Sequence, residues 1–150
     1  MKKVFEDFFS ELQADMVSIC LEYAEKNAEV IYIYCSAESN MIACQFFFKI
    51  NGTVVKKNKL NDTVTNGFRY DVSLGRQKAV MKILTEDVGK IVALCNEYGR
   101  DKPTEIKLIY NVKKNSLEAK YKYDLIYSND PNRTDYDVFN EWFDEIANLK

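Results

Sequence analysis

The chain has 150 residues, of which 47% are hydrophobic and 29% are charged, and its net charge is −2. This length and composition predict one folded domain, residues 1–150, and exclude a disordered or collagen-like chain. The complete absence of histidine removes the commonest general base and a frequent metal ligand, which argues against an enzyme.

The small net charge conceals three blocks of opposite sign. Residues 1–38 hold eight acids and three bases, residues 39–122 hold eight acids and sixteen bases, and residues 123–150 hold seven acids and two bases. Acidic ends therefore flank a basic middle. Such asymmetry bears on binding partners and association rates rather than on the fold.

The cysteines and the start of the chain bear on its location. No two cysteines have metal-ligand spacing and each lies in an apolar segment, which predicts buried free thiols at Cys20, Cys35, Cys44 and Cys95. The first residues include two lysines, but acids follow and no apolar run approaches the length of a membrane span. We therefore expect a cytoplasmic protein that makes no membrane contact.

The first half of the chain predicts one helix and several strands. Apolar side chains recur at three- and four-residue steps over residues 4–26, which indicates an amphipathic helix. Residues 29–36 and 41–50 are strands with two apolar faces, so we expect them to be central in a sheet. A third strand is expected to start at Val54, and alternation from Phe68 to Leu74 predicts another short one.

A second helix is expected over residues 76–98. Ser73 has the side chain of a helix N-cap, and Gly99 is well placed to end the helix. Beyond it, residues 106–112 and 117–123 alternate between apolar and polar side chains, which predicts a strand pair with one solvent-exposed face.

The closing segment predicts a third helix that starts near Thr134, with two acids in its first turn. The order of elements is then α-β-β-(β)-α-β-β-α. This order predicts an α+β fold with a mostly antiparallel sheet of four to six strands and three helices.

Three chemical motifs match this sequence only weakly. The spacing of a calcium loop recurs, but an aspartate stands where that loop requires glycine; the matching residues are Asp130, Asn132, Thr134, Tyr136 and Glu141. Lysines on the second strand pair face away from its tyrosines, which opposes direct nucleic-acid binding. The sequence also has no glycine-rich phosphate loop and no nucleophile elbow. We therefore expect no enzyme, no metal and no cofactor.

Two helices carry acidic stripes opposite their apolar faces. On the last helix these acids are Asp137, Glu141, Asp144 and Glu145, and on the first helix they include Asp7, Glu11, Asp15 and Glu22. Like charges four residues apart cost a few tenths of a kcal/mol, a repulsion that a basic partner would relieve. A solvated helix face is the simpler interpretation. A binding surface with Trp142 or a tyrosine as an aromatic anchor is the sharper one.

The chain resembles the YezG-like immunity proteins, the antitoxins of bacterial polymorphic toxin systems. Besides the opening helix and the closing aromatic helix, the resemblance rests on Val-Ile-Tyr-Ile-Tyr at 30–34, Gln-Phe-Phe-Phe at 45–48, Tyr-Asp-Val-Ser at 70–73 and Leu-Glu-Ala-Lys-Tyr-Lys-Tyr-Asp at 117–124. It implies a cytoplasmic protein that binds a cognate toxin, commonly a nuclease, and blocks it stoichiometrically. No catalytic residues follow from it.

We therefore expect an immunity protein whose partner is a toxin domain. Its toxin-binding candidates are the eight acids of the two stripes together with Trp142. An interaction module for another protein, or a small ligand-binding domain, is the alternative. The sequence leaves the oligomeric state open.

Overall fold

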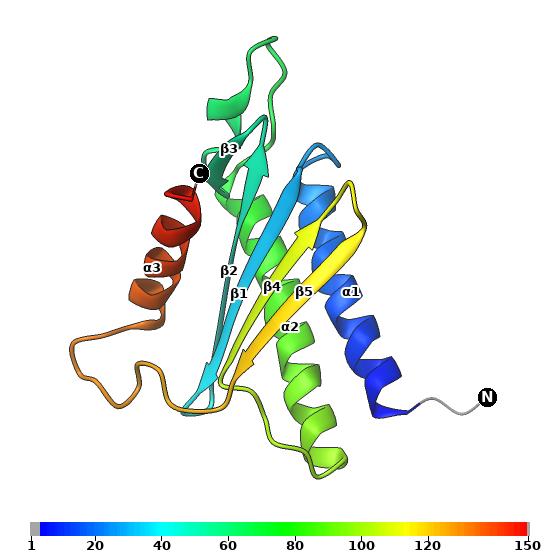
Figure 1. Cartoon of the computed structure of the whole chain (residues 1–150), viewed down its shortest axis with the longest axis vertical. Coiled ribbons are helices and arrows are strands. Elements are labelled where there is room, and N and C mark those ends of the chain that lie inside the picture. The colour runs from blue at the N-terminus through cyan, green and yellow to red at the C-terminus, as the bar shows by residue number, and fades with distance from the viewer. Residues whose placement is uncertain (1–3, 150) are drawn as a thin grey trace.

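The computed structural model describes residues 4–149 and confirms the α+β fold class (Figure 1). Within these residues the order is α-β-β-β-α-β-β-α, with one short 3-10 helix, η1, before the second α-helix. The elements are α1 (Phe5–Tyr23), β1 (Val30–Glu38), β2 (Met41–Ile50), β3 (Thr53–Lys56), η1 (Leu60–Thr63), α2 (Leu74–Glu97), β4 (Glu105–Asn111), β5 (Ser116–Lys122) and α3 (Asp135–Ala147).

The five strands form one antiparallel sheet in the order β3-β2-β1-β4-β5. The central strand is β1, which places Tyr32 opposite Phe47 on β2 and Ile109 on β4. Because β1 is covered on both faces, all its residues from Ile31 to Ser36 are buried. This explains why its sequence is apolar without alternation, and it confirms the expected central position of β1 and β2.

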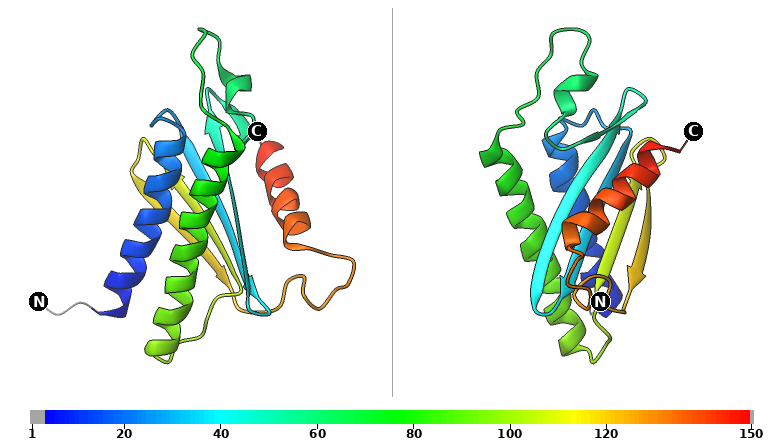
Figure 2. Two further views of the ribbon diagram at one scale, coloured as in Figure 1. Left: turned by 180° about the vertical axis from the view of Figure 1, so that it is seen from behind. Right: turned by 90° about the vertical axis from the view of Figure 1, so that its left-hand side faces the viewer.

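The larger core lies between the sheet and the pair α1–α2 (Figure 2, left). Alternate residues of the strands point toward these helices, among them Ile31, Ile33, Phe46, Phe48 and Leu108, which are at most 2% exposed. All four cysteines lie in this core as free thiols, as expected. The two long helices therefore bury most of one face of the sheet and leave it partly exposed along β5.

A second, smaller core lies on the opposite face, under α3 (Figure 2, right). Its buried residues are aromatic and aliphatic: Tyr32, Tyr34 and Phe47 from the sheet, and Val138, Phe139 and Trp142 from α3. This helix contacts β2 and β3, and its Trp142 packs on Tyr32 of β1. On the same face Glu105 of β4 is buried and the other β4 side chains are half-buried, whereas those of β5 are exposed. The exposed face of β5 explains the clean alternation of its sequence.

Side-chain caps set the helix boundaries. Ser73 Oγ accepts a hydrogen bond from the Arg76 N–H at 3.3 Å and starts α2, while Gly99 follows the end of α2 with φ +64°. Thr134 caps α3. These three predictions are confirmed. Ser73 and Thr134 accept hydrogen bonds from backbone N–H groups in the first turn of their helices, and Gly99 has the positive φ that is common just after a helix end.

The expected strand from Phe68 to Leu74 is wrong. The side chain of Asn61 accepts a hydrogen bond from the Tyr70 N–H at 2.7 Å and donates one to the Tyr70 C=O at 3.1 Å. Both backbone groups of Tyr70 are thus bound to η1 rather than to another strand, and Leu74 already belongs to α2. Alternation alone did not reveal that this segment has no neighbouring strand.

Candidate protein-binding surface

The acidic face of α3 is built on a capping box. The Thr134 N–H donates to Asp137 Oδ2 at 2.9 Å, and the Asp137 N–H donates to Thr134 Oγ1 at 3.2 Å. This reciprocal pair satisfies two backbone donors at the start of the helix, where the helix dipole also favours a negative charge. Asp137 is exposed, but its carboxylate therefore has a structural role.

Glu141 is also engaged within the chain. Arg133 Nη2 donates to both of its carboxylate oxygens, at 2.9 and 2.8 Å. Glu141 occupies the last position of the calcium-loop pattern, and in the structure its carboxylate binds Arg133. The ion pair offsets part of the repulsion between the acids on this helix face.

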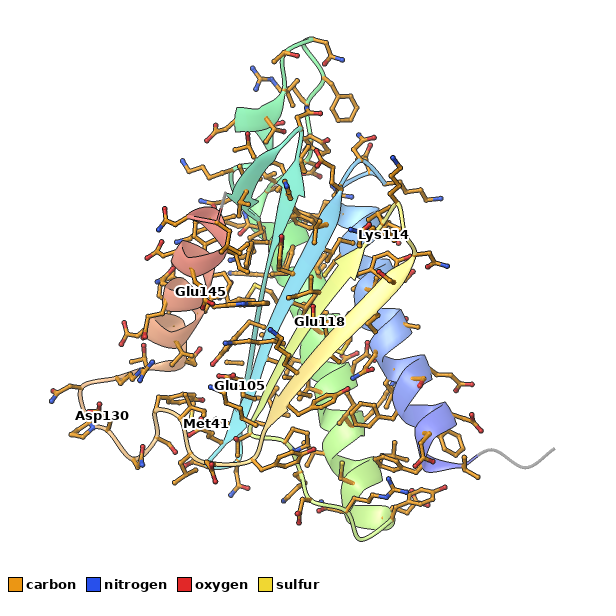
Figure 3. The ribbon with its side chains drawn as sticks, in the orientation of Figure 1. Met41, Glu105, Lys114, Glu118, Asp130 and Glu145 are labelled. Atoms are coloured by element: carbon orange, nitrogen blue, oxygen red, sulfur yellow. The ribbon has the colours of Figure 1, made fainter. Side chains whose placement is uncertain are left out.

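Asp144 and Glu145 differ from these two acids. Both are exposed on the last turns of α3, and Figure 3 shows Glu145 on this helix, apart from Glu118 on β5. Within residues 4–149, no basic side chain lies within ion-pair distance of either carboxylate. They are therefore the α3 acids most available to an external cation.

Trp142 lies in the core rather than on the surface. It is 5% exposed and packs edge-on against Phe47 and Tyr32, with ring centroids 5.2 and 6.0 Å apart. Lys107 Nζ lies 5.3 Å from its ring centroid on the side of β4. Trp142 therefore anchors α3 to the sheet, and Tyr136, which is 49% exposed, is the accessible aromatic side chain of this helix.

The sheet face beside α3 is polar, and glutamates partly neutralise its lysines. Glu105 is buried at the near end of β4, and Lys107 and Lys122 lie 3.6 and 3.9 Å from its carboxylate. On β5, Lys120 pairs with Glu118 at 3.7 Å. Tyr121 packs in the opposite core, as expected. The lysines of this face therefore alternate with acids.

Glu38 holds the connection between β5 and α3, and the sequence interpretation missed it. Its carboxylate is 2% exposed and accepts hydrogen bonds from the Ile126 N–H at 3.0 Å, the Ser128 N–H at 3.1 Å and Ser128 Oγ at 2.7 Å. Glu38 is the last residue of β1, two residues beyond the strand end expected from the sequence, and the turn that follows consists of Ser39 and Asn40, whose φ angles are +51° and +61°. A glutamate that ends a fully apolar strand was the available signal.

We expect Glu38→Gln to lower the free energy of unfolding by about 2 kcal/mol. Glutamine carries no charge, and its NH2 group cannot accept hydrogen bonds from the backbone N–H groups that Glu38 binds. Hydrogen exchange at residues 126–128 should accelerate, and urea denaturation should report the loss of stability. Glu97→Gln, at an exposed glutamate on α2, is the control and should change neither. Unaltered exchange at residues 126–128 would show that Glu38 does not hold this segment.

The acidic stripe of α1 lies on the other side of the sheet from α3 (Figure 2). Its candidate residues are all exposed: Asp7, Glu11, Asp15 and Glu22. Asp7 accepts a hydrogen bond from the Val4 N–H at 3.1 Å at the start of the helix. The structure thus brings the four α3 acids together and places the α1 acids on a separate surface.

Asp15 borders a second acid that the sequence interpretation did not select. Asp87 of α2 is 2% exposed and lies between the two helices, beside a groove of about 490 Å³ that Asp15 and Lys90 also line. Burial, together with a hydrogen bond to Asp15 and the charge of Asp15, raises the pKa of Asp87 to about 7. The Asp87 carboxyl group is therefore about half protonated near neutral pH.

This raised pKa predicts a pH-dependent stability. The folded chain binds a proton at Asp87 more tightly than the unfolded chain, in which the pKa of Asp87 is near 3.8. The free energy of unfolding therefore decreases as the pH rises from 3.8 toward 7. We expect Asp87→Asn to gain on the order of 2 kcal/mol at pH 8, and much less at pH 5. Thermal unfolding at the two pH values measures this, with the exposed Glu97→Gln as the control. Equal effects of Asp87→Asn at both pH values would contradict the assignment.

The groove between the start of α1 and the end of β5 is the main candidate for a small ligand. It has a volume of about 430 Å³ and is lined by Phe5, Gln13, Arg100 and Tyr121, among others. Gln13 donates to the Tyr121 hydroxyl, and Arg100 pairs with Glu6 at 3.0 Å and lies 4.1 Å from the Phe5 ring centroid. Four of its polar side chains are thus bound in two pairs, Gln13 with Tyr121 and Arg100 with Glu6, rather than converging on an open position.

Comparison with known proteins adds no assignment. Residues 4–149 contain no helix long and apolar enough to cross a membrane. Among the same residues, no three cysteine, aspartate or glutamate side chains are grouped as metal ligands would be. Neither the scan of family models nor the search of curated proteins found a match to this chain.

Proposed function

We propose that this chain is an immunity protein that neutralises a cognate bacterial toxin by stoichiometric binding. The observation that carries the proposal is the charge of α3, which has five acidic residues and no basic one among its thirteen residues. Within residues 4–149 the only ion pair of these acids joins Glu141 to Arg133, and Asp144 and Glu145 are the exposed ones whose carboxylates also accept no hydrogen bond. The resemblance to YezG-like immunity proteins points to the same function.

The proposed mechanism is occlusion by a rigid acidic helix. Trp142, Phe139 and Val138 hold α3 on the sheet, while Glu38 fixes the segment that leads into it. A toxin that cleaves nucleic acid carries a basic surface for phosphate, and the α3 carboxylates would occupy that surface. Preorganised complementary charge accelerates association and fixes the orientation of the complex. The acids of α1 face away from this contact.

Copurification tests the proposal. The proteins encoded by the neighbouring genes are co-expressed one at a time with the tagged chain, and the product is analysed by size-exclusion chromatography with light scattering. In one case we expect a complex with equal numbers of both chains that survives dilution to nanomolar concentration. Separate elution of the two polypeptides in every case would reject the proposal. Capture of a non-toxic protein instead would favour an adaptor module.

A further inference from the structure

The outer edge of β5 is an unoccupied pairing surface. The sheet has two edges: β3 has four residues and contacts η1 and α3, whereas β5 has seven residues. Within residues 4–149, no loop, cap or side-chain hydrogen bond reaches the backbone of Leu117, Ala119 or Tyr121. An exposed edge of this length is a template for another strand.

The backbone of β5 shows which groups face outward. The Thr104 N–H donates to the Lys122 C=O at 2.7 Å, so the Lys122 carbonyl points toward β4. Carbonyl groups alternate in direction along a strand, so those of Lys120 and Glu118 also point toward β4. The N–H and C=O groups of Leu117, Ala119 and Tyr121 are therefore the ones available to a new strand.

Side chains alternate in the same way. Glu118, Lys120 and Lys122 lie on the uncovered face of the sheet, whereas Ala119 and Tyr121 pack toward the helices. Leu117, on the helix side, is still 41% exposed. An incoming strand would thus need charges of alternating sign on one face and apolar side chains on the other.

We propose that a second copy of this chain pairs with β5 in antiparallel orientation, which continues the sheet through both copies. The pairing is centred on Ala119, opposite Ala119 of the second copy. Glu118 then faces Lys120 of the second copy, and Lys120 faces its Glu118. On the helix side, Leu117 faces Tyr121 of the second copy, which covers its exposed side chain. The twofold symmetry repeats every contact.

Charge selects this register among those that the backbone allows. The two strands can bond only when the outward-bonding residues Leu117, Ala119 and Tyr121 face outward-bonding residues of the second copy, so the register can change only in steps of two residues. A step in one direction sets Lys120 opposite Lys120 of the second copy. A step in the other direction sets Glu118 opposite Glu118 of the second copy. Like charges directly opposite each other destabilise a strand pair, and opposite charges stabilise it. The Ala119-centred register alone has two glutamate–lysine pairs and no like pair.

The helix beside this edge leaves room for the second copy. A groove of about 390 Å³ runs between α1 and the β4–β5 hairpin. Its helix side combines three small exposed residues, Ser10, Ala14 and Ser18, with three larger ones that are buried or half-buried, Gln13, Val17 and Leu21. The exposed positions that a symmetry-related α1 would meet there are therefore small. The α3 surface of the proposed toxin contact lies over the opposite edge of the sheet and stays free.

Sedimentation equilibrium of the full chain tests this pairing without any toxin. We expect a concentration-dependent species of twice the 17.5 kDa chain mass. Ala119→Pro removes an outward N–H while leaving the bonds to β4, so the folded variant should be monomeric. A wild-type chain that remains monomeric up to millimolar concentration would overturn the proposal. So would a folded Ala119→Pro chain that dimerises like the wild type.

Charge exchange tests the register and does not depend on the proline variant. Glu118→Lys alone and Lys120→Glu alone each create two like-charge contacts, and each should weaken the dimer about tenfold or more. The double variant Glu118→Lys with Lys120→Glu restores opposite charges and should return the dimer constant to near the wild-type value. A double variant as weak as the single variants would refute the Ala119-centred register.

Discussion

Replacing Trp142 by alanine is expected to lower the free energy of unfolding by about 3–5 kcal/mol, the usual cost of removing a large buried aromatic side chain. The indole is 5% exposed and packs against Phe47 and Tyr32. The smaller core under α3 has only six buried residues, so little remains to fill the cavity. Urea denaturation followed by far-ultraviolet circular dichroism measures the change, because the variant lacks the chain's single tryptophan.

Tyr136→Ala is the matched control for this prediction. Tyr136 lies on the same helix, but its side chain is 49% exposed, so we expect a loss below about 1 kcal/mol. Lys56 would still bind Asn140, at 2.8 Å, in both variants. If Trp142→Ala cost no more than Tyr136→Ala, α3 would not be docked as described, and the rigid acidic helix would lose its basis.

Reversing the charges of Asp144 and Glu145 to lysine is expected to weaken toxin binding at least a hundredfold. The introduced lysines repel a basic toxin surface, which costs several kcal/mol of binding free energy. The loss of electrostatic attraction between the two proteins also lowers the association rate, most strongly at low salt. The folded state should keep its stability, because both residues are exposed and lysine near a helix C-terminus is favourable. Titration calorimetry at two salt concentrations measures the affinity.

A charge reversal on the other face of the sheet separates local from global effects. Glu22→Lys with Glu97→Lys makes the same change in net charge on the α1–α2 side, where both residues are exposed. We expect this control to bind toxin within about threefold of the wild type. Equal losses in the two double variants would mean that total charge, and not the α3 surface, governs binding.

Reversal of Asp137 or Glu141 is less informative than reversal of Asp144 or Glu145. Asp137 caps α3, and Glu141 holds Arg133. Lysine at either position would remove a contact within the fold as well as a charge. The sequence placed all four acids on one helix face, but only the structure separates those with internal partners from those without.

Local patterns were sufficient to predict most of the fold. Several features depend only on residues close together in the sequence and can therefore be read from it. They are the helical period of α1 and α2, the caps at Ser73 and Thr134, and the end of α2 before Gly99. The strands β1, β2, β4 and β5 were also predicted near their observed bounds. These features follow from local backbone requirements and from side-chain periodicity.

Contacts between distant segments could not be predicted in the same way. Glu38 meets residues 126–128 across about ninety positions of sequence, and Asp87 meets Asp15 only because α1 and α2 pack together. The false strand near Tyr70 has the same cause, since Asn61 captures its backbone. The placement of the two acidic stripes on opposite sides of the sheet likewise follows from topology and not from local sequence.

Protection of growing cells tests the central claim most directly. A domain that copurifies with this chain and arrests growth when expressed alone is expressed in cells that carry the wild-type chain, the Asp144→Lys/Glu145→Lys variant or the Glu22→Lys/Glu97→Lys control. All three accumulate to equal levels. We predict normal growth with the wild type and the control, and arrest with the α3 variant. Arrest in the presence of the wild-type chain would contradict the account, and protection by the α3 variant would show that the toxin is bound elsewhere.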